Sequence, residues 1–381
     1  MQVTVVGGGI VGLSSAYYLA RDGADVTLLE KHSLGMGSTA RSAGGIRTQF
    51  STPVNVELSL RSLDVWDTFR EEFGVDIAHN RNGYLFVTAE EETAERFRED
   101  VTMQNDLGAE SEFITPAEAR ELCPGLETDD LVNATYNGQD GFADPNLAVQ
   151  GYAQQAREEG VDIRPKTPVT DVRTDGNAVT GVETADETID ADFVVNAAGA
   201  WSRTIAEMAD VDLPIHPRRR QLAVVDPQRT LSEDVPLTIN LDSGSYFRPE
   251  RDGAALVGGH FGDDPDVDAD YYSDSLDIEW AATAVERAAE YTAYFGGDSR
   301  IRRGWAGLYA VTPDHHPIIE ETTSGFITAA GFSGHGFQHA PATGQIVSEL
   351  VHDGEPSLVD VSSLSSTRFE EGNSIVEHNV A

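Results

Sequence analysis

The chain has 381 residues, enough for two or three domain-sized units, and its 65 Asp plus Glu against 26 Lys plus Arg give a formal net charge of −39. That charge excludes nucleic acid and anionic membrane surfaces as partners, because both require clustered Lys and Arg, and the single cysteine, Cys123, excludes an internal disulfide. No stretch reaches the roughly 18 apolar residues that span a bilayer, and Met1 leads directly into the first strand, so we expect a cytoplasmic protein without a membrane span.

The first elements along the chain form a βαβ pattern. Residues 2–6 (QVTVV) are a short apolar strand, and residues 10–22 carry apolar side chains at helical spacing. Residues 25–29 (DVTLL) are a second apolar strand. The order predicts a βαβ unit at the beginning of an α/β fold.

The turn between the first strand and the helix carries a nucleotide-binding pattern. Residues 7–12 (GGGIVG) contain G-x-G-x-x-G, and Glu30 closes the second strand. Gly7 permits the tight turn, Gly9 lets backbone amides approach a pyrophosphate at the helix N-terminus, and Gly12 allows close helix-strand packing. Glu30 is then placed to hold both ribose hydroxyls, which disfavours NADP and leaves FAD and NAD open.

Further along the chain, helices and strands alternate before a β-rich stretch. Helical periodicity predicts helices at residues 53–73, 90–107, 115–123, 145–159, 275–295 and 341–350. Apolar runs predict strands at residues 83–88 and 192–196, a strand-turn-strand meander between residues 159 and 192, and β-structure over residues 216–259. The acidic run at residues 262–270 is predicted to be a loop.

One short segment departs from the acidic character of the chain. Residues 217–221 (PRRRQ) are the only dense basic run, and we interpret them as partners of acidic neighbours. Elsewhere the carboxylates are spread among apolar segments, which indicates a folded protein with an acidic surface rather than a disordered tail. This halophilic composition resembles that of proteins from salt-in organisms, in which high salt screens the repulsion between carboxylates.

Five segments together carry a family resemblance. Residues 31–50 (KHSLGMGSTARSAGGIRTQF) form a long loop of small residues where a nicotinamide dehydrogenase would continue into another βα unit, whereas an extended FAD needs such a loop beneath its flavin. With GGGIVGLSSAYYLARDGADVTLLEK before this loop, and DFVVNAAGAWS, RGWAGLYAVTPDHHPIIE and GFSGHGFQHAPATGQIVSEL after it, the chain resembles the D-amino-acid oxidase superfamily of flavoenzymes. GGIRTQF and WAGLYAVTPDHHP are most similar to its amine-oxidising branch, which includes sarcosine oxidase, dimethylglycine dehydrogenase and the β subunit of dye-linked L-proline dehydrogenase.

The resemblance implies the architecture and the cofactor. A Rossmann-like FAD-binding domain with a parallel sheet is expected from residues 1–75, 145–215 and 304–381. A substrate domain on a large antiparallel or mixed β-sheet is expected from residues 76–144 and 216–303. The FAD is expected to be non-covalent, because Arg41 occupies the histidine position used for attachment in dimethylglycine-dehydrogenase-like proteins.

The glycine motif and the resemblance together nominate the residues that contact FAD. They are Gly7, Gly9, Ile10, Val11, Gly12, Glu30, Lys31, Ser38, Arg41, Ser42, Ala43, Gly44, Val169, Ala198, Gly199, Trp201, Gly331, Gly334, His335, Gly336, Phe337 and Gln338. Residues 331–339 enter a helix whose positive end and backbone donors would stabilise the N1–C2=O edge of the reduced flavin, so His335 and Gln338 are also candidate catalytic residues. No metal site is expected, because His, Cys and carboxylate groups do not recur at ligand spacing.

The resemblance also nominates residues around the substrate. Arg47 matches the position whose arginine grips the substrate carboxylate, a role suited to its planar fork of donors. Tyr309 stands where glycine oxidase and D-amino-acid oxidases have an arginine, which argues against those two activities. Tyr246 and His260 lie on the β-rich stretch that would roof the substrate. Gln338 replaces the lysine typical of sarcosine oxidases, which puts reaction with oxygen in doubt.

These features lead to one principal hypothesis about function. We expect oxidation of a secondary or N-methyl amino acid, proline- or sarcosine-like, by hydride transfer to flavin N5, giving an imine that water hydrolyses. Orientation by Arg47 and electrostatic stabilisation would suffice, so no side-chain base is nominated. The alternatives are an FAD-binding electron-transfer subunit or assembly-factor-like oxidoreductase, and a different substrate such as a D-amino acid, a 2-hydroxy acid or glycerol 3-phosphate. An electron-acceptor protein or a partner subunit is compatible with each of these functions.

Overall fold

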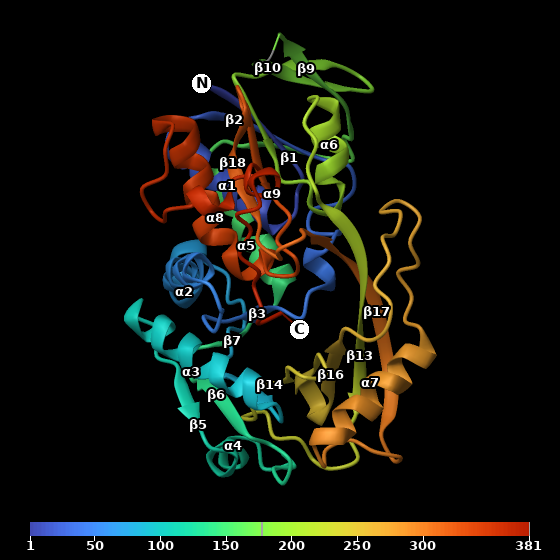
Figure 1. Ribbon diagram of the computed structural model, residues 1–381. Coiled ribbons are helices and arrows are strands. Elements are labelled where there is room, and N and C mark those ends of the chain that lie inside the picture. The colour runs from blue at the N-terminus through green and yellow to red at the C-terminus, as the bar shows by residue number, and fades with distance from the viewer. Residues whose placement is uncertain (177, 381) are drawn as a thin grey trace.

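The computed structural model describes residues 1–176 and 178–380, in which the first of two large sheets holds the N-terminal motif (Figure 1). This sheet has the strand order β18-β19-β12-β1-β2-β8, and its pairings are parallel except between β18 and β19. Its strands are β1 (Gln2–Val6), β2 (Asp25–Glu30), β8 (Asp162–Pro165), β12 (Phe193–Asn196), β18 (Ile318–Thr323) and β19 (Phe326–Ala330). The predicted βαβ unit is confirmed, with α1 (Ile10–Arg21) joining β1 to β2.

Helices cover this sheet and bury an aromatic core. Figure 1 shows α1, α5 (Pro145–Glu158) and α8 (Gly336–Asp353) together in the upper half of the molecule, with α2 (Pro53–Phe73) beneath them. Phe69 and Phe73 of α2 stack with ring centroids 4.3 Å apart, and Tyr152 of α5 packs on both rings. Helices α1 and α8 approach so closely that a Cβ at Gly344 would lie 2.3 Å from Ser14 Oγ. The meander consists of β9 (Val169–Asp175), β10 (Ala178–Thr184) and β11 (Thr188–Asp190), and Figure 1 shows β9 and β10 at the top of the molecule, with α6 (Ser202–Met208) beside β1.

The second large sheet has eight strands in the order β17-β13-β16-β15-β14-β4-β6-β5. Its pairings are antiparallel except between β14 and β4, which run parallel, so the sheet is mixed. Its strands are β4 (Tyr84–Thr88), β5 (Glu112–Ile114), β6 (Asn133–Asn137), β13 (His216–Asp226), β14 (Leu237–Asn240), β15 (Ser245–Pro249), β16 (Ala255–Gly259) and β17 (Arg300–Val311). Helices α3 (Glu91–Asp106), α4 (Pro116–Leu122) and α7 (Ile278–Tyr291) flank it. The expected α/β fold, a parallel Rossmann-like sheet with a mixed second sheet, is confirmed.

Two long strands connect the halves of the molecule. Strands β13 and β17 pair from His216 opposite Val311 to Asp226 opposite Arg300. In Figure 1 they run from beside the first sheet down into the second. The division of the chain into a cofactor domain and a substrate domain remains our proposal, and its boundary after residue 303 passes through β17.

The structure corrects two details near the expected flavin. The helix predicted at residues 341–350 begins earlier, at Gly336, and Pro341 lies inside it. Pro341 is the sixth residue of this helix, beyond the first turn in which a proline costs no hydrogen bond, so the helix continues past a position that has no main-chain donor. A two-stranded ladder of β3 (Gly45–Ile46) and β7 (Gly141–Phe142), for which the sequence offers no apolar run, joins the loop after Glu30 to the residues after β6.

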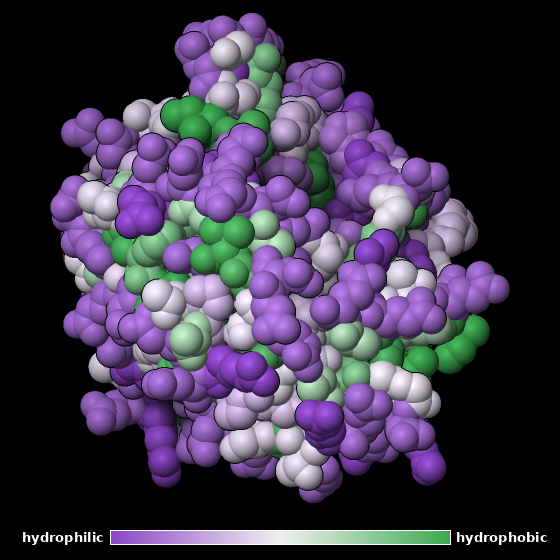
Figure 2. Space-filling model, turned by 60° about the horizontal axis from the view of Figure 1, so that its bottom comes forward, coloured by the Kyte–Doolittle hydropathy of each residue, from purple (hydrophilic) through white to green (hydrophobic). Residues whose placement is uncertain are grey.

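The basic run and the acidic loop prove to be partners. Arg218 pairs with Asp266 at 2.9 Å, and Arg220 donates to both carboxylate oxygens of Asp264 at 2.5 and 2.8 Å. The interpretation of the arginines as partners of acidic neighbours is therefore confirmed for Arg218 and Arg220, whereas Arg219 donates to the main-chain O atoms of Ser273 and Ser275. The face seen in Figure 2 is largely hydrophilic, with apolar residues in small separate areas. Among the described residues, no helix is long and apolar enough to cross a membrane.

Candidate active site

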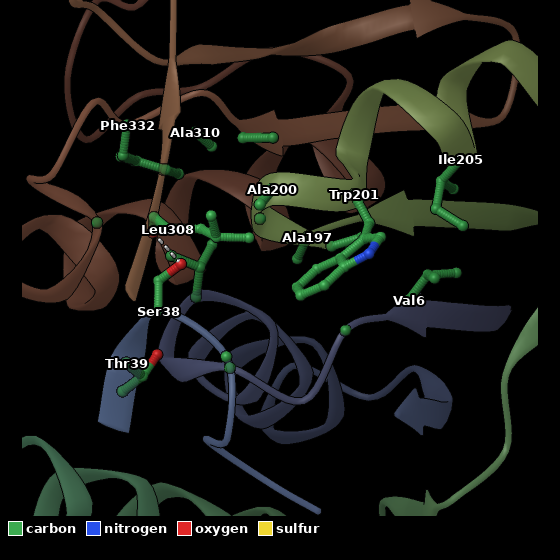
Figure 3. A pocket seen from close by; sticks show the side chains of 18 of the residues that line it. Val6, Ser38, Thr39, Ala197, Ala200, Trp201, Ile205, Leu308, Ala310 and Phe332 are labelled. Atoms are coloured by element: carbon green, nitrogen blue, oxygen red, sulfur yellow. Dashed lines mark hydrogen bonds between the residues drawn. The ribbon is translucent and has the colours of Figure 1, made fainter. Parts of the chain in front are cut away.

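A cavity of about 360 Å³ lies at the carboxyl ends of β1, β2 and β12, the edge at which α/β sheets bind nucleotides. It extends from Glu30 and Trp201 to Tyr309 and Gly334. Figure 3 shows Val6, Trp201 and Ile205 on one side of this cavity and Ser38, Thr39 and Leu308 on the other, with Ser38 Oγ donating to Leu308 O at 2.6 Å. The loop after β2 and strand β17 thus meet across the middle of the cavity.

The glycine turn is shaped for close backbone approach. Gly7 has a φ of +116°, and a Cβ there would lie 2.4 Å from Ala197 O. A Cβ at Gly12 would lie 1.9 Å from Gly7 O, so the first turn of α1 requires hydrogen at both positions. Gly9 is the N-cap of α1 and has no side chain to cap it. Ile10 N donates to Thr39 Oγ1 at 3.2 Å, so the main-chain N–H groups that follow it in the first turn are the ones available to an anion in the cavity.

The end of the cavity beside the glycine turn holds polar groups suited to a ribose and its neighbours. The Glu30 carboxylate accepts from Gly8 N and His32 N, both at 2.7 Å, and retains further lone pairs. Asp270 Oδ1 accepts from Lys31 Nζ at 2.6 Å and from Trp201 Nε1 at 2.8 Å, and Nζ lies 3.8 Å from the centroid of the indole ring. The hydrogen bond from Lys31 lowers the pKa of Asp270.

A second, smaller cavity of about 70 Å³ adjoins the first, and residues 42, 309 and 334 line both. Strands β4, β14 and β15 of the second sheet contribute its roof. The roof side chains are Tyr84, Leu237, Ile239 and Tyr246. The other walls come from the loop around β3 and from the start of α8, and they include Arg47, His335 and Gln338.

Arg47 is buried beside this smaller cavity, with 5% of its surface exposed. Its guanidinium donates to Gln49 O and to Asn379 O, and it lies 3.9 Å from the centroid of the Phe50 ring. Its main-chain N donates to Gln338 Oε1 at 2.8 Å. Burial lowers the pKa of Arg47 from its very high ordinary value, which leaves a fixed and poorly hydrated cation at the cavity wall.

His335 is a neutral neighbour of that cation. Its Nε2 lies 3.4 Å from an Arg47 Nη2 atom that can only donate, which assigns the proton to Nδ1. Nδ1 has no partner among the described residues, and a buried N–H without a partner is costly. Burial, and then the charge of Arg47, hold the pKa of His335 well below its ordinary value. His335 therefore places a neutral ring with an unpartnered, buried N–H in the wall of the smaller cavity.

Comparison with known proteins identifies the family and its cofactor. A model of the DAO family, "FAD dependent oxidoreductase", matches residues 2–350. The chain belongs to this family. Its cofactor is FAD, and its reaction is the FAD-dependent oxidation of amino acids or amines.

Individual relatives cover almost the whole chain. L-proline dehydrogenase from P. horikoshii superposes with a TM-score of 0.88 and 34% identity over 97% of this chain and 98% of that structure. FAD-dependent oxidoreductase domain-containing protein 1 of Xenopus laevis is 31% identical over 100% of this chain and 84% of its own length. Mitochondrial dimethylglycine dehydrogenase of Rattus norvegicus is 28% identical over 97% of this chain, which spans only 45% of that protein.

Most residues nominated for FAD line the larger cavity. They are Gly7, Gly9, Ile10, Val11, Glu30, Lys31, Ser38, Ser42, Val169, Ala198, Gly199, Trp201, Gly331, Gly334, Gly336 and Phe337. The glycine cradle fits the pyrophosphate of FAD, since a Cβ at Gly9 would meet only Thr39 Oγ1, at 3.4 Å, and would otherwise project into open space. These residues would hold FAD along the cavity.

Six nominated residues lie elsewhere. Gly12 packs beneath the turn, and Gly44 lies against Ala143 O, where a Cβ would come within 2.0 Å, so neither lines the larger cavity. His335 and Gln338 line the smaller cavity. Arg41 and Ala43 line a third cavity of about 20 Å³, and Ala43 also lines the smaller one.

The structure brings together only some of the residues that were predicted to contact the substrate. Arg47, Tyr246 and Tyr309 line the smaller cavity. His260 does not, because the outer end of β16 places it in the third cavity beside Arg220, where burial lowers its pKa to about 3. Tyr309 lines both the smaller and the third cavity, and its ring is edge-on to that of His260 at a centroid distance of 5.7 Å.

Several residues of the site were not found from the sequence. The sequence indicated only strand positions for Tyr84, Leu237 and Ile239. Their side chains reach the cavity because β4 and β14 are neighbours in the folded sheet. Asp270 lay in a segment predicted only to be a loop. The partners of Arg47 at residues 49 and 379 are main-chain carbonyls, which no side-chain pattern reveals.

We expect the contact between Lys31, Trp201 and Asp270 to strengthen FAD binding. Asp270→Asn removes the charge but keeps an acceptor, and it is expected to raise the Kd for FAD about two- to fivefold at low salt, because an exposed ion pair contributes about 0.2–1 kcal/mol. The difference should shrink at high salt. Fluorescence titration of the apoprotein with FAD measures the effect. Asp263→Asn, an exposed residue of the same loop, is the control, and an equal effect of both changes would contradict a specific contact.

Proposed function

We propose that the protein oxidises a small secondary or N-methyl amino acid, proline- or sarcosine-like, to an imine that water then hydrolyses. The observation that carries the proposal is the composition of the smaller cavity. It combines one buried cation, Arg47, with tyrosine and aliphatic side chains, and it adjoins the FAD cavity. A single carboxylate on a small apolar body matches this arrangement.

The charge of the cavity separates this substrate class from the alternatives. Of the described residues that line it, only Arg47 is a cation, which suits a monoanionic carboxylate better than a phosphate. The similarity to L-proline dehydrogenase from P. horikoshii and to dimethylglycine dehydrogenase supports a secondary or N-methyl amine. Tyr309, in place of an arginine, supports neither glycine nor a D-amino acid as the substrate.

The chain's own residues would act by position and by solvent exclusion. Arg47 would hold the carboxylate, while Leu237, Ile239 and Tyr246 would cover the apolar part and keep water away. His335, in the wall of the smaller cavity, would add a neutral polar ring beside Arg47. Bound FAD supplies the hydride acceptor. The described residues that line the smaller cavity include no carboxylate, which supports a reaction without a side-chain base.

Gln338 supports a dehydrogenase rather than an oxidase. Its side chain is an uncharged acceptor for Arg47 N, whereas a cation beside the flavin would favour reaction with oxygen. We therefore propose that an acceptor other than oxygen, such as an electron-acceptor protein or a partner subunit, reoxidises non-covalently bound FAD.

Anaerobic reduction of the bound FAD tests the proposed substrate class. At high salt, L-proline, sarcosine or dimethylglycine is expected to bleach the flavin absorbance within seconds to minutes. D-proline, a 2-hydroxy acid and glycerol 3-phosphate should leave it unchanged. Bleaching by glycerol 3-phosphate or a 2-hydroxy acid alone would contradict the proposal, and FAD that no amine reduces would favour an electron-transfer or assembly role.

A further inference from the structure

We propose that residues 377–379 belong to the substrate site and act as positioning residues for Arg47, an inference that rests on the proposed function. After α9 (Arg368–Glu371) the chain returns between the two large sheets, and Figure 1 shows the label C beside β3. Glu377 is 1% exposed and Asn379 is 5% exposed. The segment does not line the smaller cavity itself, but it contacts Arg47, which does.

Glu377 anchors the segment to the cofactor half of the molecule. Its carboxylate accepts from Ser51 N and Oγ at 2.7 and 2.6 Å, from Thr52 Oγ1 at 2.7 Å and from Asn55 Nδ2 at 3.0 Å. Asn379 N also donates to it, at 3.1 Å. Burial opposes ionisation of Glu377, yet these hydrogen bonds hold its pKa below the usual range. Glu377 is therefore a buried anion at the start of α2.

Asn379 links the segment to Arg47 and to the other half of the molecule. Its main-chain O accepts from Arg47 Nη2, while its side-chain Nδ2 donates to Asp100 Oδ2 of α3 at 3.2 Å. Gln49 O accepts from the other terminal nitrogen of Arg47, so two carbonyls from opposite parts of the chain define the plane of the guanidinium. That plane decides which donors remain for a substrate carboxylate.

The Glu377 carboxylate and the main-chain carbonyl of Asn379 both stabilise the Arg47 cation. Among the charged groups that favour the cationic form of Arg47 against burial, Glu377 has the largest effect, ahead of Asp140. Without the segment, the guanidinium loses its strongest compensating charge and one of its two carbonyl acceptors. It would then be free to turn or to reach water, and a carboxylate would have to reorder it on binding.

Chemical protection of Arg47 tests the positioning role without any substrate. In the FAD-loaded wild-type protein, Arg47 is expected to resist modification by phenylglyoxal, as read from the Arg47 peptide by mass spectrometry. A chain stopped after Gly372, and the milder variant Glu377→Gln, should be modified at Arg47 about tenfold faster. Glu370→Gln, an exposed residue of α9, is the matched control. A Glu377→Gln protein in which Arg47 is as protected as in the wild type would overturn the inference, and this point variant carries the test if the stopped chain does not fold.

Ligand binding tests the consequence for the substrate site. Tetrahydrofuran-2-carboxylate, in which oxygen replaces the amine nitrogen of proline, should perturb the flavin spectrum of the wild type, and Glu377→Gln should raise its Kd by about tenfold, as expected for a disordered charge-assisted contact. An unchanged Kd in Glu377→Gln overturns the positioning role. A wild type that binds no carboxylate, with Arg47 still released in the variants, would instead contradict the proposed function and leave the contact between residues 377–379 and Arg47 standing.

Discussion

Replacing Arg47 with alanine is expected to lower kcat/KM for a carboxylate-bearing amine by roughly 30-fold to 1,000-fold. This range corresponds to about 2–4 kcal/mol, the usual cost of removing one partner of a buried charged hydrogen bond. The loss should appear mainly in KM, because the cation binds a group that does not change during the oxidation. Arg47→Lys keeps the charge but not the planar fork, so it should recover only part of the activity.

A matched pair of substrates separates binding of the carboxylate from a general loss of structure. L-proline carries the carboxylate and pyrrolidine does not, so Arg47→Ala should slow flavin reduction by L-proline far more than by pyrrolidine. FAD content and thermal unfolding at high salt must accompany the kinetics, because the change leaves the buried carboxylates of Asp140 and Glu377 without their neighbouring cation. Equal losses with both substrates would rule out a carboxylate clamp.

Gly12→Ala is the second change with a large expected effect, on the fold itself. The new methyl group would lie 1.9 Å from Gly7 O, a main-chain atom that cannot move without displacing the turn against Ala197. We expect a loss of about 3 kcal/mol or more in the free energy of unfolding, at the upper end of the cost of overpacking, together with loss of FAD. Denaturant unfolding and the flavin-to-protein absorbance ratio, both at high salt, measure the two effects.

Two other glycines provide controls for this change. A Cβ at Gly297 would meet nothing within 4 Å, so Gly297→Ala should leave stability and FAD content unchanged. At Gly9, Ala would contact only Thr39 Oγ1 at 3.4 Å, so Gly9→Ala should fold yet bind FAD more weakly. A Gly12→Ala protein with normal stability and a full complement of FAD would show that α1 does not pack on β1 as described.

Local patterns predicted the elements that hold FAD. The strand at residues 2–6 and the helix at residues 53–73 have the predicted bounds, and α1 differs by one residue. These elements are specified within a few residues by apolar spacing and by turn glycines, which are visible in one sequence. The start of α8 was missed by five residues, because Pro341 looked like a first-turn proline while the glycine-rich segment before it looked like a loop.

The surroundings of Arg47 could not be predicted in the same way. The family resemblance nominated Arg47, but the depth of its burial and the identity of its neighbours depend on contacts between distant segments. Asn379 lies 332 positions away in sequence and His335 lies 288 positions away. Tyr84, Leu237 and Ile239 became cavity residues only through the parallel pairing of β4 with β14.

By itself, then, the sequence determined the nucleotide-binding βαβ unit, the α/β class and an acidic exterior, because each follows from composition or from spacing over a few residues. Only the tertiary structure decided that the site for the amine is a small cavity between two sheets, with His260 outside it and residues 377–379 against Arg47. The physical reason is that strand order and main-chain hydrogen bonds between distant segments do not require particular side chains, so they produce no local sequence pattern. The carbonyl of Asn379 would bond Arg47 equally well from any residue type.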